Sequence, residues 1–314
     1  MKITAKRHPY KFYLTVTFVF SFFLALGCFM FKIYGNESQQ DEFELKILLL
    51  PIFATLVISM AFYSVWQYFK NAPIVVVENE IISFGKTSYP ITEIKELILT
   101  GKMPFRYIVK YPMEGALLIF NDDSKKYIFD DMYSNTWQLK CVLEKTIHRN
   151  EEYHLRENGK IDPERVLKQQ VEIFTGSQVI SLRGISLWGV VVFFLYMGLS
   201  KENLPSSGFW WAFFWFGSFW FFLNSYLMHY FGLTKEFLIV KNQNLLWRKH
   251  IYRLSDVQEV VFESSYQQPN CMRIITKDFR NKLYPAANLR DYRWLELKAK
   301  LEHKGITVRN ECIW

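Results

Sequence analysis

Two stretches of the chain decide the fold: Ile74–Leu99, IVVVENEIISFGKTSYPITEIKELIL, and Phe237–Phe262, FLIVKNQNLLWRKHIYRLSDVQEVVF. They align without a gap at a separation of 163 residues, and the matches include Val77 with Val240, Asn79 with Asn242 and Tyr89 with Tyr252. Each stretch follows two long apolar runs. We therefore expect an internal repeat, in which two membrane spans and one soluble domain occur twice.

Four apolar runs contain no Asp, Glu, Lys or Arg. A spanning helix needs ~20 mostly apolar residues. The third run has 17 residues, and Arg183 and Lys201 at its ends can reach toward the polar phase. A chain that is 50% hydrophobic and 18% aromatic also fits a membrane protein. The expected spans are Phe12–Phe31, Ile47–Phe69, Gly184–Ser200 and Asn203–Thr234.

The distribution of Lys and Arg predicts the orientation. The first eleven residues contain four basic residues and no acid, whereas Lys201 and Glu202 are the charges between the third and fourth spans. Because basic flanks favour the cytoplasmic side, we expect both termini and both soluble domains in the cytoplasm. The expected spans contain no charged residue, which argues against an ion pump or proton relay.

These observations divide the chain into five parts. A tail with the first pair of spans is followed by a soluble domain, a linker helix, the second pair of spans and the second soluble domain. The expected bounds are 1–69, 70–150, 151–183, 184–232 and 233–314.

Both soluble domains begin with strands. Val75–Val77 and Leu238–Val240 are aliphatic runs followed by polar turns, and each domain ends with an amphipathic pattern typical of a helix. The pattern of a strand, a turn and a second strand then leads into YPITEIKEL (from Tyr89) and YRLSDVQEV (from Tyr252). This pattern resembles bacterial pleckstrin-homology-like (bPH) membrane proteins, which have such domains after pairs of transmembrane helices.

The resemblance implies a PH-like roll and membrane attachment, but no reaction and no agreed ligand site. The predicted fold class is thus an α+β membrane protein. It has four transmembrane helices in two hairpins and two cytoplasmic PH-like β-roll domains, each closed by a C-terminal helix.

The second soluble domain carries the basic surface. The chain has a formal net charge of +8, and basic residues exceed acidic ones in the tail and after the fourth span. Next to an anionic leaflet each such cation contributes ~1 kcal/mol. One interpretation is a solvated basic face, and the other is a site for a lipid headgroup or a partner. The candidate site residues are Lys241, Arg248, Lys249, Arg253, Lys277, Arg280 and Lys282.

The sequence contains no sign of an enzyme. The four Cys are far apart, the six His have no metal-ligand spacing, and no nucleophile or phosphate-binding motif is present. We therefore predict no catalytic residues, no metal and no cofactor. No known nucleic-acid motif accompanies the basic residues, so we predict no nucleic-acid partner.

The leading hypothesis is a non-enzymatic membrane interaction or scaffold protein. Its partners would be membrane lipids and a protein, and a homo-oligomer is compatible with the architecture. Immunity to a membrane-targeting toxin, or a role in envelope stress, is one form of this hypothesis. An oligomeric channel or pore is the alternative, and a lipid-modifying enzyme is a third class.

Overall fold

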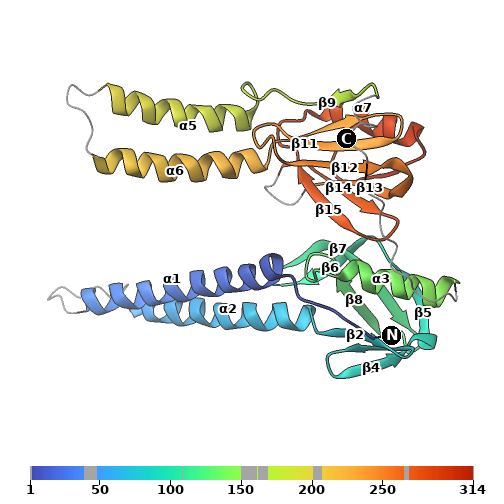
Figure 1. The fold of residues 1–314 in the computed structure, drawn as a ribbon. Helices are drawn as coiled ribbons and strands as arrows, with labels where there is room; N and C mark the ends of the chain where they lie inside the picture. Colours follow the sequence, from blue (N-terminus) through green and yellow to red (C-terminus); the bar gives the residue numbers. More distant parts are fainter. Residues whose placement is uncertain are drawn as a thin grey trace. The chain divides into compact units, whose positions relative to one another are not determined.

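The computed structural model describes residues 2–38, 48–107, 109–149, 161, 169–200, 207–264 and 269–313. The chain divides into two units, Met1–Leu155 and Arg156–Trp314. Each unit is α+β and consists of a pair of helices and a domain of mostly antiparallel sheets packed against a further helix (Figure 1).

The first unit contains two sheets, with strand orders β1-β2-β3-β4 and β5-β7-β6, and β8 pairs with β7. Two-residue turns such as Asn79-Glu80, with φ of 46° and 63°, connect its first strands. The elements are β1 (Lys2–Thr4), η1 (Pro9–Leu14), α1 (Thr15–Glu37), α2 (Leu49–Asn71), β2 (Val75–Glu78), β3 (Ile81–Phe84), β4 (Thr87–Pro90), η3 (Ile91–Glu93), β5 (Ile94–Ile98), β6 (Lys102–Arg106), β7 (Lys110–Phe120), β8 (Lys125–Phe129), α3 (Thr136–Glu144) and η4 (Lys145–Arg149).

The second unit also contains two sheets, with strand orders β9-β10-β11-β12 and β15-β14-β13-β16. All pairs are antiparallel except β13 with β16. The elements are β9 (Glu172–Phe174), α5 (Leu182–Leu199), α6 (Ser207–Tyr226), β10 (His229–Leu233), β11 (Phe237–Asn242), β12 (Lys249–Arg253), η5 (Leu254–Asp256), β13 (Val257–Glu263), β14 (Cys271–Thr276), β15 (Asn281–Pro285), α7 (Asp291–His303) and β16 (Thr307–Asn310).

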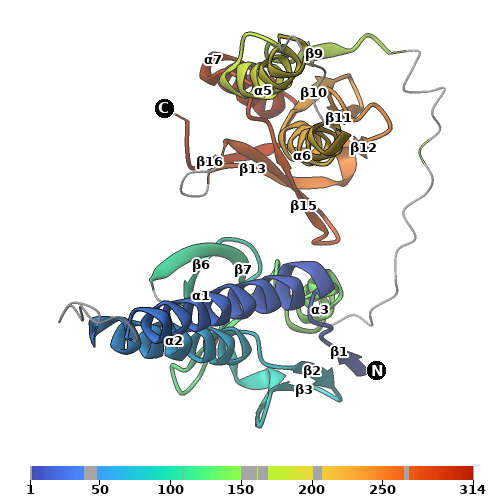
Figure 2. The same ribbon diagram turned by 90° about the vertical axis from the view of Figure 1, so that its left-hand side faces the viewer.

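Each helix pair is closed at its base by a strand pair. In the first unit β1 precedes α1 and pairs with β2, which follows α2, so that Ile3 lies opposite Val77. In the second unit β9 precedes α5 and pairs with β10, which follows α6, so that Phe174 lies opposite Phe231. Figures 1 and 2 show α1 beside α2 and α5 beside α6. The chain therefore enters and leaves each helix pair at the same sheet.

Each β domain has a main hydrophobic core, and the second unit has a smaller separate cluster around Phe237 and Ile239. In the first unit, buried Ile82 comes from one sheet, Leu118 from the other and Leu139 from α3. In the second unit, the ring of Trp294 on α7 lies 5.4 Å from that of Phe231 and 4.7 Å from that of Phe262, between centroids. Aromatic packing of this kind buries 150–250 Å² per ring, at order of magnitude, and holds the helix against both sheets.

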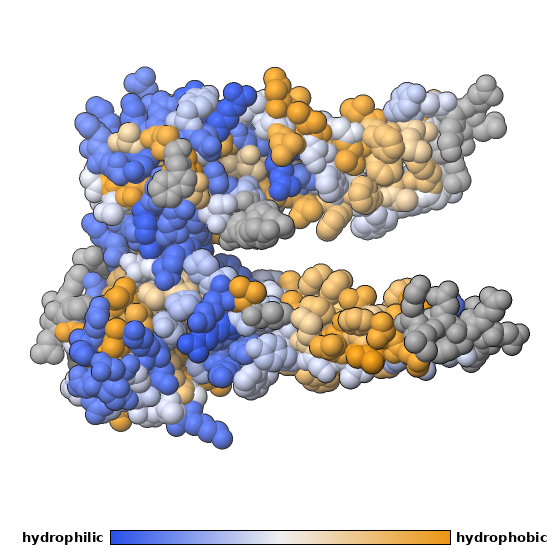
Figure 3. Space-filling view, turned by 180° about the vertical axis from the view of Figure 1, so that it is seen from behind, coloured by the Kyte–Doolittle hydropathy of each residue, from blue (hydrophilic) through white to orange (hydrophobic). Residues whose placement is uncertain are grey.

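Three of the four expected spans are confirmed as helices long and apolar enough to cross a membrane: the segment from Pro9 to Glu37, α2 and α5. The fourth is not confirmed, because α6 is not among them. Four Trp, together with Ser, Gly and Asn, lower its hydropathy. It is also shorter than expected, since His229–Leu233 of the predicted span form β10. Figure 3 shows hydrophobic surface along the helices of each unit.

The strand registers agree with the expected alignment only from Thr87 and His250 onward. Tyr89 of β4 pairs with Ile82 of β3, and Tyr252 of β12 pairs with Leu238 of β11. The two tyrosines therefore have the same place in the strand order of their sheets. The expected match of Val77 with Val240 is wrong. In the first unit Val77 pairs with Ile82, and in the second unit Leu233 pairs with Leu238. Since Ile82 and Leu238 have the same place in the sheet, Val77 corresponds to Leu233.

The difference comes from one turn. In the first unit two residues separate Phe84 of β3 from its partner Thr87 of β4. In the second unit nine residues separate Val240 of β11 from its partner His250 of β12. The second unit thus has seven additional residues in this connection. A gap-free alignment cannot represent that difference in length.

Two further expectations need correction. Most of the predicted linker helix lies outside the described residues, and in the described part Glu172–Phe174 form strand β9 instead of helix. The second unit does not end with its helix, because β16 follows α7 and extends the sheet beside β13. This strand pairs with Glu259–Phe262 and so satisfies backbone donors and acceptors on the edge of β13 that faces away from β14.

Candidate functional site

The described part of the second unit has a pocket between two sheet edges. β12 is the last strand of one sheet and β15 the last strand of the other. The pocket between them has a volume of about 370 Å³. It is lined by Ile161, Ile251, Tyr252, Arg253, Asp256, Thr276, Arg280, Asn281 and Lys282. We call it the edge pocket.

Three of the seven predicted basic residues line the edge pocket: Arg253, Arg280 and Lys282. One lining residue, Asp256, is acidic. Arg280 also contacts Asp278, whose Oδ2 lies 3.0 Å from Arg280 Nε. The lining therefore has more positive than negative charge, together with the hydroxyl of Thr276 and the amide of Asn281.

Lys282 lies close to other basic and aromatic groups. Burial, and then the nearby charge of Arg248, lower the pKa of Lys282. Its Nζ lies 2.9 Å from Nε2 of His250 and 5.7 Å from the centre of the Tyr284 ring. An ammonium group has only donors, so His250 accepts through Nε2 and is neutral in this contact. Burial, and then Lys282 and Arg248, lower the pKa of His250.

A second group of predicted residues lies at the connection between β11 and β12. Lys241 and Lys249 are directly opposite each other in the strand pair. The guanidinium of Arg248 lies 5.2 Å from the centre of the Tyr226 ring, at the end of α6. Like charges on directly opposite residues repel each other. An anion bound between the two ammonium groups would relieve this repulsion.

Lys277 belongs to neither group. It is exposed on the turn between β14 and β15, and its backbone N donates a hydrogen bond of 2.8 Å to Asp256 O. The structure thus brings three predicted residues together at the edge pocket and three at the β11–β12 connection.

Sequence reasoning missed the aromatic and histidine residues that line the pocket or lie near Lys282. The hydroxyls of Tyr252 and Tyr284 lie 2.5 Å apart, and His229 Nδ1 lies 2.9 Å from Pro285 O. Burial is the main reason that the pKa of His229 is lowered to about 4. The four residues come from β10, β12 and β15, so no spacing along the chain could have grouped them.

The first unit lacks two of these three cations at the corresponding positions. The third is retained, because Leu118 pairs with Lys126 as Ile274 pairs with Lys282. The strand registers match Arg253 with Pro90 and Arg280 with Ser124. In the first unit the ring of Tyr89 instead stacks on Phe120, with centroids 4.1 Å apart. Arg253 and Arg280 are therefore the pocket cations that distinguish the second unit.

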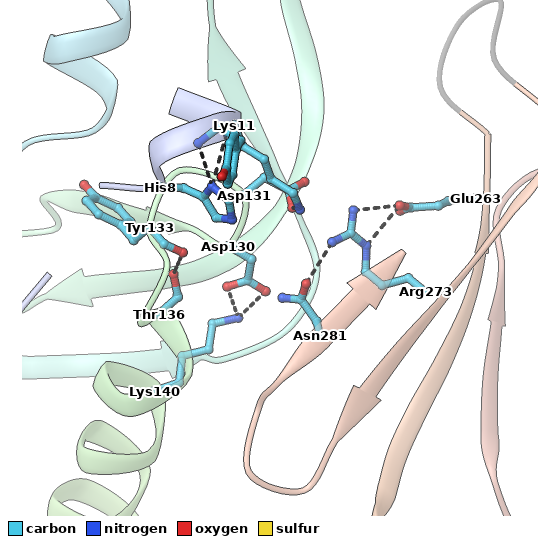
Figure 4. Close-up of polar contacts among 11 residues, drawn as sticks. His8, Lys11, Asp130, Asp131, Tyr133, Thr136, Lys140, Glu263, Arg273 and Asn281 are labelled. Carbon is cyan, nitrogen blue, oxygen red and sulfur yellow. Dashed lines mark hydrogen bonds and ion pairs between the residues drawn. The ribbon is translucent and has the colours of Figure 1, made fainter. Parts of the chain in front are cut away.

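Each unit also contains a buried ion pair that has a structural role. Figure 4 shows Lys140 beside Asp130, where Nζ lies 2.6 Å from Oδ1 and 2.8 Å from Oδ2. It also shows the guanidinium of Arg273 between Glu263 and Asn281, with Nη2 2.8 Å from Glu263 Oε1. Both pairs are shielded from solvent, which removes them from direct contact with a ligand.

No group of three His, Cys, Asp or Glu that could hold a metal ion occurs in the part of the chain that the structure describes. The four cysteines, all within the described ranges, form no disulfide. No model of a known protein family matches the chain, and no curated protein matches it. The functional argument therefore depends on the geometry of the edge pocket and of the helix pairs.

Proposed function

We propose that the chain is a multi-pass membrane protein that acts as a non-enzymatic interaction module and binds an acidic, extended segment of a partner protein. The observation that carries the proposal is the convergence of Arg253, Arg280 and Lys282 on a pocket between two sheet edges. Extended segments bind to proteins by adding to an exposed strand, where main-chain hydrogen bonds give affinity and side-chain pockets give specificity.

The membrane arrangement follows from the helix pairs. In the proposal α1, α2, α5 and α6 all cross the bilayer, and α6 is stabilised there by its contact with α5. Trp220 Nε1 donates a hydrogen bond of 3.1 Å to Ser186 O, and the Phe194 and Phe213 ring centroids are 5.5 Å apart. The pairing of β1 with β2, and of β9 with β10, requires both ends of each hairpin to be on one side of the membrane.

The basic flanks favour the cytoplasmic side for both β domains. Together with the resemblance to the bPH membrane proteins, this makes a bacterial inner membrane the proposed location. The shared element order and the matching turns support an origin of both units from one module. A PH-like roll, as in the bPH membrane proteins, is the proposed form of that module. Protection against a membrane-targeting toxin is one role in which an interaction module of this kind would serve.

The position of the edge pocket favours a protein segment over a lipid headgroup. β12 begins next to the end of α6 and leads away from it. Arg253 is four residues along this strand from Lys249, which corresponds to roughly 13 Å at a rise of ~3.3 Å per residue. A headgroup in the same leaflet lies near the helix end, whereas a segment of a cytoplasmic partner can reach the far end of the strand.

A fluorescence anisotropy titration tests the proposal. The full chain is placed in nanodiscs of phosphatidylcholine, and the probe is a fluorescein-labelled peptide of alternating Glu and Val. We expect saturable binding that weakens at least about tenfold in Arg253→Gln, because a charge-assisted hydrogen bond contributes ~1.5–3 kcal/mol. Lys277→Gln is the matched control, since it removes one exposed cation of the same unit outside the pocket.

Equal affinities for the Arg253→Gln and Lys277→Gln variants would show that the peptide responds to overall charge, and the proposal would fail. A peptide of alternating Lys and Val should not bind. If the acidic peptide binds only when phosphatidylglycerol is present in the nanodisc, the ligand is a lipid-bound complex and the pocket is not the recognition site.

A further inference from the structure

The connection between β11 and β12 is a second unassigned surface. It comprises Lys241–Lys249, and its centre is the exposed dipeptide Leu246-Trp247. The side chains of Leu246 and Trp247 are 80% and 73% exposed. Exposed large apolar residues next to each other are costly in water and usually indicate a contact surface. We call Lys241–Lys249 the tip.

The tip is fixed to the end of α6. The Nδ2 of Asn242 donates to Ser225 O over 2.6 Å, and the backbone N of Gln243 donates to Met228 O over 2.9 Å. Asn244 Nδ2 donates to Ser225 Oγ over 2.9 Å. Together with the contact of Arg248 with the Tyr226 ring, these bonds hold Leu246 and Trp247 at the level where the helix ends.

The residues before α5 lie at the same level. The side-chain amide of Gln178 contacts Asn244 of the tip, and Ser181 caps α5 by accepting a hydrogen bond of 3.0 Å from Gly184 N. The neighbouring apolar side chains are exposed, namely Val179 (59%), Ile180 (73%) and Leu182 (85%). Two separate segments thus present exposed apolar side chains around the base of one helix pair.

The charges next to these apolar residues identify the partner. Lys241, Arg248 and Lys249 flank the dipeptide. Trp is enriched at the boundary between hydrocarbon and headgroups, and Lys and Arg are attracted to anionic lipids there. A tip built from Leu, Trp, Arg and Lys at the end of a membrane helix matches the chemistry of that boundary.

The first unit shows that the tip is not needed to connect the strands. The corresponding connection is the two-residue turn Gly85-Lys86, in which Gly85 has φ of 62°. The seven additional residues of the second unit therefore have another role than closing the hairpin. From their position and composition we infer that the tip is a lipid anchor, which inserts Leu246 and Trp247 among the headgroups and selects anionic lipid through Arg248 and Lys249.

This inference depends on the proposed membrane insertion of α5, and the experiment separates the two. Benzoylphenylalanine is introduced at Trp247, at Phe193 on α5 or at Lys235, and the full chain is irradiated in nanodiscs of phosphatidylcholine and phosphatidylglycerol. Lys235 lies in the exposed turn between β10 and β11, at the opposite end of the same strands. Lipid adducts are identified by intact-protein mass spectrometry.

We expect lipid adducts at positions 247 and 193 but not at 235. We also expect phosphatidylglycerol to be enriched at least about twofold over its mole fraction in the adducts at 247, and not in those at 193. Arg248→Gln with Lys249→Gln should remove this enrichment while the adducts at 193 remain.

Adducts at 193 without adducts at 247 would overturn the lipid anchor and leave the membrane proposal intact. The absence of adducts at 193 would overturn both. Adducts at 235 as frequent as those at 247 would show that lipid contact is unspecific, and enrichment that survives the double substitution would exclude Arg248 and Lys249 as the selective groups.

Discussion

Asp123 and Phe279 have the same left-handed backbone conformation at corresponding turns of the two units, with φ of 58° and 57°. Asp123 N donates to Phe120 O over 2.9 Å, and Phe279 N donates to Thr276 O over 2.8 Å. The left-handed region costs a residue with a Cβ roughly 1–2 kcal/mol. In the first unit a short polar side chain reduces this cost. In the second unit the phenyl ring is buried, with 3% exposure, and its burial offsets the cost.

This conformation predicts an unusual order of two substitutions. Phe279→Ala removes the buried ring but retains the left-handed strain, and we expect a loss of about 3 kcal/mol in the free energy of unfolding. Phe279→Gly removes both, so it should be about 1 kcal/mol less destabilising than Phe279→Ala. Thermal unfolding of the full chain in detergent measures the order. A glycine variant less stable than the alanine variant would contradict the role of the backbone strain.

The buried ion pair of Lys140 and Asp130 predicts a second asymmetry. The side chains are 1% and 2% exposed. Asp130→Ala leaves the ammonium buried without its partner, and we expect a loss of roughly 3–5 kcal/mol in the free energy of unfolding. Asp130→Leu with Lys140→Met removes both charges and should cost much less. A double variant that is as unstable as Asp130→Ala would indicate that packing, and not charge, determines the effect.

The sequence predicts what depends on local composition. Runs of about twenty apolar residues identify α1, α2 and α5, and the matched tyrosines Tyr89 and Tyr252 identify corresponding strands. It does not predict β1, because the pairing of Ile3 with Val77 joins residues separated by a helix hairpin. Three-residue strands have too few positions for a period-two pattern to emerge.

The candidate site was predictable only as a list of cations. Charge along the sequence does not reveal that Lys241 lies opposite Lys249, or that Arg253 and Lys282 line one pocket from different sheets. Those relationships depend on strand register, and a seven-residue insertion shifted the register from the one that the alignment gave. A one-residue error in register already reverses which face a side chain occupies.

The hydrogen bonds of Asn135 predict that its side chain stabilises β1 and the residues that follow it. Its Oδ1 accepts a hydrogen bond of 2.7 Å from Lys6 N, and its Nδ2 donates one of 3.0 Å to Thr4 O. Asn135→Ala removes both, each worth ~1 kcal/mol, so we expect amide exchange in residues 2–6 to accelerate by about tenfold or more. Hydrogen–deuterium exchange in nanodiscs measures this, and Asn121→Ala at an exposed turn is the control. Unchanged exchange in residues 2–6 would show that β1 is held by other contacts.

Buried His229 predicts loss of stability in acid. Its pKa is lowered to about 4, chiefly by burial and then by the charges of Arg248 and Lys282, while the ring packs between Tyr226 and Tyr284. A histidine of the unfolded chain has a pKa of ~6.5. The unfolded state therefore binds a proton at a higher pH than the folded state.

The sign of the effect follows. Above about pH 6.5 the stability from neutral His229 is fully present, and it decreases as the pH falls from about 6.5 to about 4, by at most about 3 kcal/mol. In His229→Gln this part of the pH dependence should disappear, because glutamine does not titrate there. The measurement is the free energy of unfolding in detergent at several pH values, with His303→Gln on α7 as the control. If wild type and His229→Gln lose stability in parallel between pH 6.5 and 4, another group is responsible for the acid sensitivity.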